Sequence, residues 1–173
     1  MDIDQLKGIV RDIPDFPKPG ILFKDITPLV KDPDALKFII GHGLNLFSRQ
    51  NITAVAGIEA RGFIFGSLMA WELGVSFIPL RKPGKLPYKV REISYTTEYS
   101  TAALEIHEDA LSSKDNVLLV DDLLATGGSA KAACDLIKQL GATIAACFFI
   151  VELDFLNGKE ILKEYPVHSL LHY

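Results

Sequence analysis

Two adjacent carboxylates followed by small residues form the stretch of this sequence with the clearest chemical potential. Asp121 and Asp122 directly follow the apolar run of residues 117–120, and the small-residue stretch 125–129 comes next, before a helical pattern. An apolar run without alternation predicts a strand buried on both faces, typical of a parallel sheet. Backbone amides at a helix start bind phosphate. Carboxylates next to such amides suit a ligand with hydroxyls beside its phosphate, that is, a sugar phosphate.

The spacing argues against two other phosphate-binding motifs. Lys131 stands at the wrong distance for a Walker loop, and only Gly127 and Gly128 of a dinucleotide fingerprint are present. An alternative is a plain strand-to-helix turn in which Asp122 only caps the helix. That alternative uses one of two adjacent, mutually repelling carboxylates, so we favour the ligand site.

A second group of charged residues follows two earlier predicted strands. Residues 53–58 predict a strand that ends in a polar turn, and there Arg61 stands beside the free amides of a helix start. The strand predicted at 75–80 leads into the basic loop 81–87. These cations suit a second, multiply charged phosphate, although a solvated basic turn is the alternative. Residues 88–100 are polar and β-prone, which predicts a mobile flap or hairpin over the site.

Composition sets the class of protein. A chain of 173 residues, 49% hydrophobic and 23% charged, fits one soluble domain. The net charge of −4 gives no electrostatic reason to expect nucleic acid as a partner, and no apolar run is long enough for a membrane span. The acidic start of the chain lacks the basic region of a secretory leader. Cys134 and Cys147 sit in apolar patterns as small buried residues, so we expect a cytoplasmic protein.

The alternation of strand and helix patterns predicts an α/β fold, a single domain with a mainly parallel central sheet flanked by helices. Apolar spacing predicts a helix over residues 3–13, and Asp32 followed by proline predicts another helix start. Further on, we expect a strand at 143–151, a last helix around 161–165 and a closing strand at 167–171. The four histidines lack metal-ligand spacing, so no metal-binding residue is predicted.

The stretch around the two aspartates resembles the signature of the type I phosphoribosyltransferases, enzymes that use 5-phosphoribosyl-1-pyrophosphate (PRPP). The resemblance implies their fold, with a base-binding hood within residues 1–32 and a mobile catalytic flap at 81–103. It also implies that the acidic pair contacts the ribose hydroxyls, that the following loop holds the 5′-phosphate, and that Mg²⁺ bridges pyrophosphate and ribose oxygens. The implied PRPP-binding residues are Asp121, Asp122, Ala125, Thr126, Gly127, Gly128, Ser129, Arg61, Arg81, Lys82 and Lys85.

Residues 14–27, 59–63, 81–87 and 121–128 are similar to the branch of this family that uses adenine. That resemblance implies transfer of the phosphoribosyl group to adenine, with AMP and pyrophosphate as products, and by analogy a homodimer. The implied adenine-binding residues are Leu22, Phe23, Lys24 and Leu153, and the implied catalytic residues are Glu98, Tyr99 and Arg61. Phe23 would stack on the base and Glu98 would handle the proton on the imidazole side of the purine. A non-proline cis peptide before residue 60 or 61 is also implied.

Two alternatives stay open. A 6-oxopurine phosphoribosyltransferase would need a side-chain donor such as lysine near the base, and residues 152–154 offer none. A regulator that senses PRPP without turning it over would usually carry a DNA-binding extension or a basic face, and the chain leaves little room for either.

Overall fold

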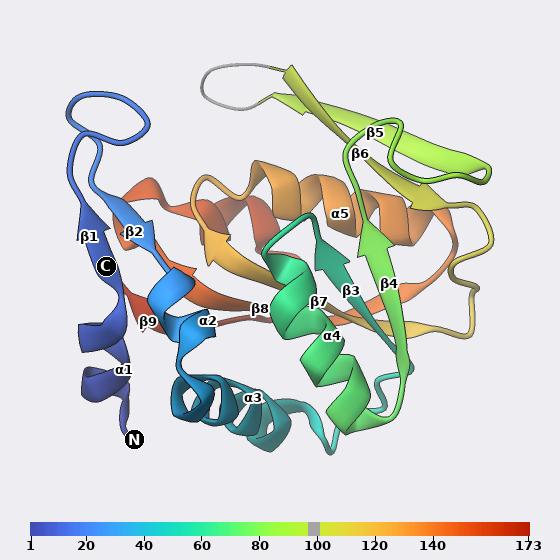
Figure 1. Cartoon of the computed structure of the whole chain (residues 1–173). Helices are drawn as coiled ribbons and strands as arrows, with labels where there is room; N and C mark the ends of the chain where they lie inside the picture. The colour runs from blue at the N-terminus through green and yellow to red at the C-terminus, as the bar shows by residue number, and fades with distance from the viewer. Residues whose placement is uncertain (97–100) are drawn as a thin grey trace. The chain divides into compact units, whose positions relative to one another are not determined.

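The computed structural model describes residues 1–96 and 101–173, and the chain divides into two compact units, Met1–His42 and Gly43–Tyr173. In the first unit a short antiparallel pair lies between helices (Figure 1). Its elements are α1 Ile3–Ile9, β1 Arg11–Ile13, β2 Phe23–Asp25, α2 Thr27–Lys31 and the start of α3 Pro33–Phe47.

The helix predicted over residues 3–13 is wrong at its C-terminal end. Helix α1 stops at Ile9 because residues 11–13 pair with β2, placing Ile13 opposite Phe23. Strand pairing thus overrides the helical spacing of the apolar residues. The start of α3 is as predicted, since Asp32 Oδ1 accepts a hydrogen bond of 2.8 Å from Asp34 N.

The second unit is built on a five-stranded parallel sheet in the order β4-β3-β7-β8-β9, so the predicted α/β fold is confirmed (Figure 1). Its elements are β3 Ala54–Ile58, α4 Gly62–Leu73, β4 Ser76–Leu80, β5 Val90–Thr96, β6 Thr101–His107, β7 Asn116–Leu124, α5 Gly128–Gln139, β8 Thr143–Glu152, η1 Asp154–Leu156, η2 Gly158–Leu162 and β9 Val167–His172. The last predicted helix, around residues 161–165, is wrong in type, because the chain there forms the 3₁₀ turn η2, which ends at Leu162.

The order of the strands creates a switch point between β3 and β7. The chain leaves β3 for β4 on one side of the sheet and leaves β7 for β8 on the other. With right-handed crossovers, α4 and α5 then cover opposite faces. Ligands of open α/β sheets bind at the carboxyl ends of strands beside such a switch point. The polar turns after β3 and β7 are at this place.

Burial explains why β7 is a central strand. The side chains of residues 117–120 are 0% exposed, and the strand continues through the two aspartates to Leu124. The core between the sheet and α5 also contains Leu104 and Ile106 of β6, so the base of the antiparallel β5–β6 hairpin is anchored in the second unit. The hairpin predicted from the polar, β-prone sequence is confirmed over the described residues. Among those residues no helix is both long and apolar enough to cross a bilayer.

Candidate active site

A cavity of about 920 Å³ opens at the carboxyl ends of β3 and β7. This volume is typical of a small-molecule site. Its walls come from the β3–α4 turn, the β7–α5 turn, the start of the basic loop and the β5–β6 hairpin. The structure therefore brings together most of the predicted PRPP-binding residues, namely Arg61, Lys82, Asp121, Asp122, Ala125, Thr126, Gly127, Gly128 and Ser129.

The acidic pair is tied to Arg61. Asp122 is 5% exposed, and its Oδ2 atom accepts a 2.6 Å hydrogen bond from Arg61 Nε. Asp121 Oδ1 accepts from Asp122 N at 2.9 Å. Burial, and then the neighbouring carboxylate of Asp122, raise the pKa of Asp121 well above its ordinary value. Two hydroxyls of a ribose would supply hydrogen bonds to carboxylates in this position.

Gly62 allows the β3–α4 turn to pack closely against the end of β7. A Cβ atom at Gly62 would lie 2.7 Å from Asp121 Oδ1 and 2.9 Å from Val120 O. Only glycine lets the start of α4 pack this closely on β7. This contact places Arg61, the residue before Gly62, within reach of Asp122.

The turn that was predicted to bind phosphate leads into helix α5, as expected from the sequence. Gly127 has a φ of +84° and is the N-cap of α5, so the first helical amides have no capping side chain from that residue. Free amides and the positive end of the helix dipole bind an anion. Ser129 Oγ donates a 3.0 Å hydrogen bond to Tyr95 Oη, which links the turn to the β5–β6 hairpin. Sequence reasoning missed Tyr95, because strand polarity alone does not tell which residue faces a distant turn.

Gly158 supports the phosphate-binding turn from behind. A Cβ atom at Gly127 would lie 2.5 Å from Gly158 O, and a Cβ atom at Gly158 would clash with Ala125 O. Asn157, the residue before Gly158, adopts φ +51°. The close packing of these two backbone segments was not predictable, since they are far apart in the sequence.

The basic loop contributes only one of its three predicted PRPP-binding cations to the cavity wall. Lys82 is among the lining residues, whereas Arg81 and Lys85 are not. Arg81 Nε instead donates a 3.1 Å hydrogen bond to Glu59 Oε2. Burial opposes ionisation of Glu59, but the Lys82 amide and the Arg81 guanidinium lower its pKa overall.

The predicted adenine-binding residues lie apart in the chain. Leu22, Phe23 and Lys24 belong to the first unit, where the Phe23 ring packs edge-on against Phe16 at 5.1 Å and Lys24 Nζ lies 2.6 Å from Asp12 Oδ1. Leu153 belongs to the second unit, and its amide donates to Leu124 O at 3.0 Å. The predicted catalytic residues Glu98 and Tyr99 lie outside the described residues.

Two other expectations can be compared with the structure. The non-proline cis peptide is confirmed at Glu59–Ala60. One group of potential metal ligands occurs among the described residues, formed by Glu152, Asp154 and His172. The positive charge beside this group is the ammonium group of Lys159, whose Nζ atom lies 2.7 Å from Glu152 Oε2. We therefore assign no metal to this group.

Comparison with known proteins agrees with this geometry. The phosphoribosyl transferase domain family matches residues 34–167, which is more than half of the chain and includes the whole cavity. Fold and site together define a protein of the phosphoribosyltransferase class.

The relatives narrow this class. The adenine phosphoribosyltransferase of Nitrosococcus oceani is 67% identical over 99% of this chain and 100% of its own length, and that of Methylococcus capsulatus is 64% identical over the same shares. The crystal structure of the Thermoanaerobacter pseudethanolicus enzyme matches with a TM-score of 0.96 at 44% identity, covering 99% of this chain and 100% of that one. The chain belongs to the adenine phosphoribosyltransferase family.

Proposed function

We propose that this protein transfers the 5-phosphoribosyl group from PRPP to adenine, giving AMP and pyrophosphate in purine salvage. The observation that carries the proposal is the Arg61–Asp122 pair beside the amide-rich turn of α5 in a single cavity. Such a constellation can hold a diol, a phosphate and a pyrophosphate together. Adenine as the acceptor is supported by the relatives, among them a Saccharomyces cerevisiae structure complexed with adenine, 40% identical with a TM-score of 0.92 over 98% of both chains.

In this proposal the two aspartates and the turn orient PRPP. Asp121 and Asp122 accept hydrogen bonds from the ribose hydroxyls, and the amides and hydroxyls of residues 125–129 hold the 5′-phosphate. Bond breaking at the anomeric carbon places positive charge on the sugar and negative charge on the leaving pyrophosphate. Preorganised cations around that pyrophosphate lower the barrier, because they bind the transition state more strongly than the ground state. Arg61 and Lys82, the two of the four predicted cations that line the cavity, supply this positive charge.

A separate set of residues is proposed to hold and activate the base. Phe23 stacks on adenine, and backbone groups at Leu22 and Lys24 read its edge. Glu98 takes part in moving the proton on the imidazole side as the purine nitrogen attacks the ribose, and Tyr99 helps to close the flap over the reacting atoms.

The site fits Mg²⁺ as the cofactor. Hard oxygen donors are present in Asp121 and Asp122, and the raised pKa of Asp121 marks a place where a nearby cation would favour the ionised carboxylate. When bound, Mg²⁺ would neutralise charge on the pyrophosphate. The two carboxylates are the residues that would hold it there.

Assembly and location follow from other features. Trp71 and Leu68, on the outer side of α4, are 82% and 37% exposed, and large exposed apolar side chains of this kind support a homodimer. The buried thiols of Cys134 and Cys147 lie 3.8 Å apart without a disulfide, in keeping with a reducing cytoplasm.

A turnover assay with adenine, hypoxanthine and guanine as acceptors tests the proposal. PRPP and Mg²⁺ are supplied, and nucleoside monophosphate and pyrophosphate are measured. We expect AMP with adenine and little product with the two 6-oxopurines. Turnover of hypoxanthine or guanine in preference to adenine would support the 6-oxopurine alternative, and PRPP binding without turnover would support a sensor.

A further inference from the structure

Residues 81–85 of the basic loop, which lies between β4 and the hairpin, are held in place by two carboxylates from other elements. Glu59 follows β3, and Glu105 belongs to β6. Glu105 is 6% exposed, its Oε2 atom accepts a 3.1 Å hydrogen bond from Gly84 N, and its backbone pairs with Arg81 in both directions at 3.0 and 2.7 Å. Hydrogen bonds within the protein therefore define the shape of this loop.

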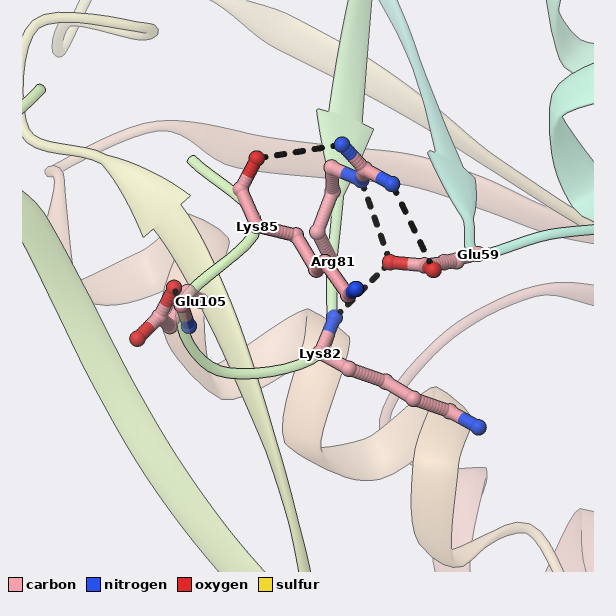
Figure 2. Close-up of polar contacts among 6 residues, drawn as sticks. Glu59, Arg81, Lys82, Lys85 and Glu105 are labelled. Carbon is pink, nitrogen blue, oxygen red and sulfur yellow. Dashed lines mark hydrogen bonds and ion pairs between the residues drawn. The ribbon is translucent and has the colours of Figure 1, made fainter. Parts of the chain in front are cut away.

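Glu59 makes three contacts with the first two residues of this loop (Figure 2). Its Oε2 atom accepts from Arg81 Nε at 3.1 Å and from the Lys82 amide at 3.0 Å, and its Oε1 atom accepts from Arg81 Nη2 at 3.4 Å. The carboxylate side chain is 15% exposed and that of Arg81 32% exposed. Charge-assisted hydrogen bonds in such a partly buried position are stronger than those of exposed pairs.

Arg81 extends this link to the end of the loop. Its Nη1 atom donates a 3.0 Å hydrogen bond to the backbone oxygen of Lys85. The guanidinium thus connects Glu59 to both ends of the loop, and its charge is offset by the carboxylate that it binds. Arg81 thus has the contacts of a structural residue that cross-links the loop, and it does not line the cavity.

Lys82 contacts Glu59 through its backbone, unlike Arg81, which does so through its side chain. Its backbone amide is held by Glu59, while its side chain points away from that carboxylate (Figure 2) and contributes to the cavity wall. The fixed backbone anchors the stem of this side chain beside the cavity, so its ammonium group stays within reach of an anion bound there. Preorganisation of this kind is what a site for a leaving anion requires.

We propose that Glu59 is a positioning residue of the pyrophosphate subsite, acting through Arg81 and the Lys82 amide, so that Lys82 is the cation that this loop presents to the pyrophosphate. This inference rests on the proposed function. Glu59 itself lines the cavity, and its hydrogen bonds to Arg81 and the Lys82 amide offset the charge with which it would repel pyrophosphate.

The test is the substitution Glu59→Gln, which keeps the size of the side chain but removes its charge. We expect the KM for PRPP and the dissociation constant of Mg²⁺-pyrophosphate to rise roughly tenfold, which is the loss of about one charge-assisted hydrogen bond. The KM for adenine should change less than about twofold, because the loop does not contact the base. The shorter Glu59→Asp should give a smaller effect in the same direction, and it serves in place of Glu59→Gln if that variant does not fold.

A double-mutant cycle tells whether Arg81 acts through Glu59 or binds PRPP directly. If Arg81 acts only together with Glu59, the double variant Glu59→Gln/Arg81→Gln should be no worse for PRPP than the poorer single variant. Effects that multiply would make Arg81 an independent ligand and overturn the proposal. The matched control is Glu164→Gln, which removes the charge from an exposed ion pair with Lys138 and should leave all constants unchanged.

Two outcomes are distinguishable from a failure of the proposed function. A wild-type protein that makes no AMP contradicts the function itself. An active wild type with an unaltered Glu59→Gln variant, or a variant in which both KM values rise equally, contradicts only the role of Glu59.

Discussion

Ser129 Oγ lies 3.0 Å from Tyr95 Oη and thereby joins the phosphate-binding turn of α5 to strand β5 of the hairpin. A hydroxyl pair of this kind can reverse its direction, since each oxygen both donates and accepts. When Ser129 turns its hydrogen toward a phosphate, Tyr95 can donate to Ser129 in its place. The contact therefore connects the filling of the phosphate site to the hairpin that carries the predicted flap.

The substitution Tyr95→Phe tests this connection. Loss of one neutral hydrogen bond should raise the KM for PRPP by roughly two- to tenfold, because the Ser129 hydroxyl is no longer held in place. Steady-state kinetics with PRPP as the varied substrate measure the effect. Tyr88→Phe is the matched control, since Tyr88 is 58% exposed and outside the cavity wall. Equal constants for both variants would show that the contact has no role in binding.

We predict that the Asp121 carboxylate favours PRPP binding but lowers the stability of the fold. Burial and the adjacent Asp122 carboxylate raise its pKa in the folded chain, so its contribution favours folding at low pH and is lost as pH rises through that folded pKa. Above it, the ionised carboxylate destabilises the ligand-free fold. Asp121→Asn should therefore raise the melting temperature at pH 8, by about 2–4 °C for each kcal/mol relieved, and weaken PRPP binding.

Melting curves of the wild type and Asp121→Asn between pH 4 and pH 8 provide the measurement. The difference in melting temperature should be smaller at the acidic end, where the wild-type carboxyl is protonated. Asp135→Asn, on the outside of α5, is the control because its carboxylate is paired with Lys131. A variant that is less stable than the wild type at pH 8 would contradict the repulsion inferred for the acidic pair.

Gly158→Ala should damage the phosphate site without touching a ligand. The added Cβ atom would clash with Ala125 O and lie 3.1 Å from Leu124 Cδ1, so the turn has to move. We expect a loss of roughly tenfold or more in kcat/KM for PRPP, since small displacements of positioning groups are costly. Gly41→Ala is the control, because nothing lies within 4 Å of a Cβ atom there and its φ is ordinary. Kinetics of the two variants decide the matter, and unchanged PRPP constants in Gly158→Ala would refute the supporting role.

Glu98→Ala tests the catalytic proposal for the flap. Removal of a group that moves a proton should lower kcat by more than about tenfold. Binding of PRPP should remain nearly intact, because Glu98 is proposed to act on the purine. Single-turnover kinetics and calorimetry with PRPP give the two readouts. An unchanged kcat would remove Glu98 from the chemistry.

Local patterns in the sequence were sufficient for much of this protein. The buried run before Asp121, the small residues after Asp122 and the proline-led start of α3 predicted a strand, a strand-to-helix turn and a helix at their observed places. These features are local because hydrogen bonds and burial within a few residues decide them. The resemblance of the same motifs predicted the family.

Only the tertiary structure decided the order of the strands and which residues meet across the site. The end of α1 at Ile9, the 3₁₀ turns after β8, the Tyr95–Ser129 contact and the packing of Gly158 on the turn all depend on partners far away in the chain. The same holds for Arg81, whose type predicted a ligand for pyrophosphate and whose guanidinium the structure pairs with Glu59. A charged residue shows its type in the sequence, but its partner is set by the packing of strands that are distant in sequence, and the partner determines what the charge can do.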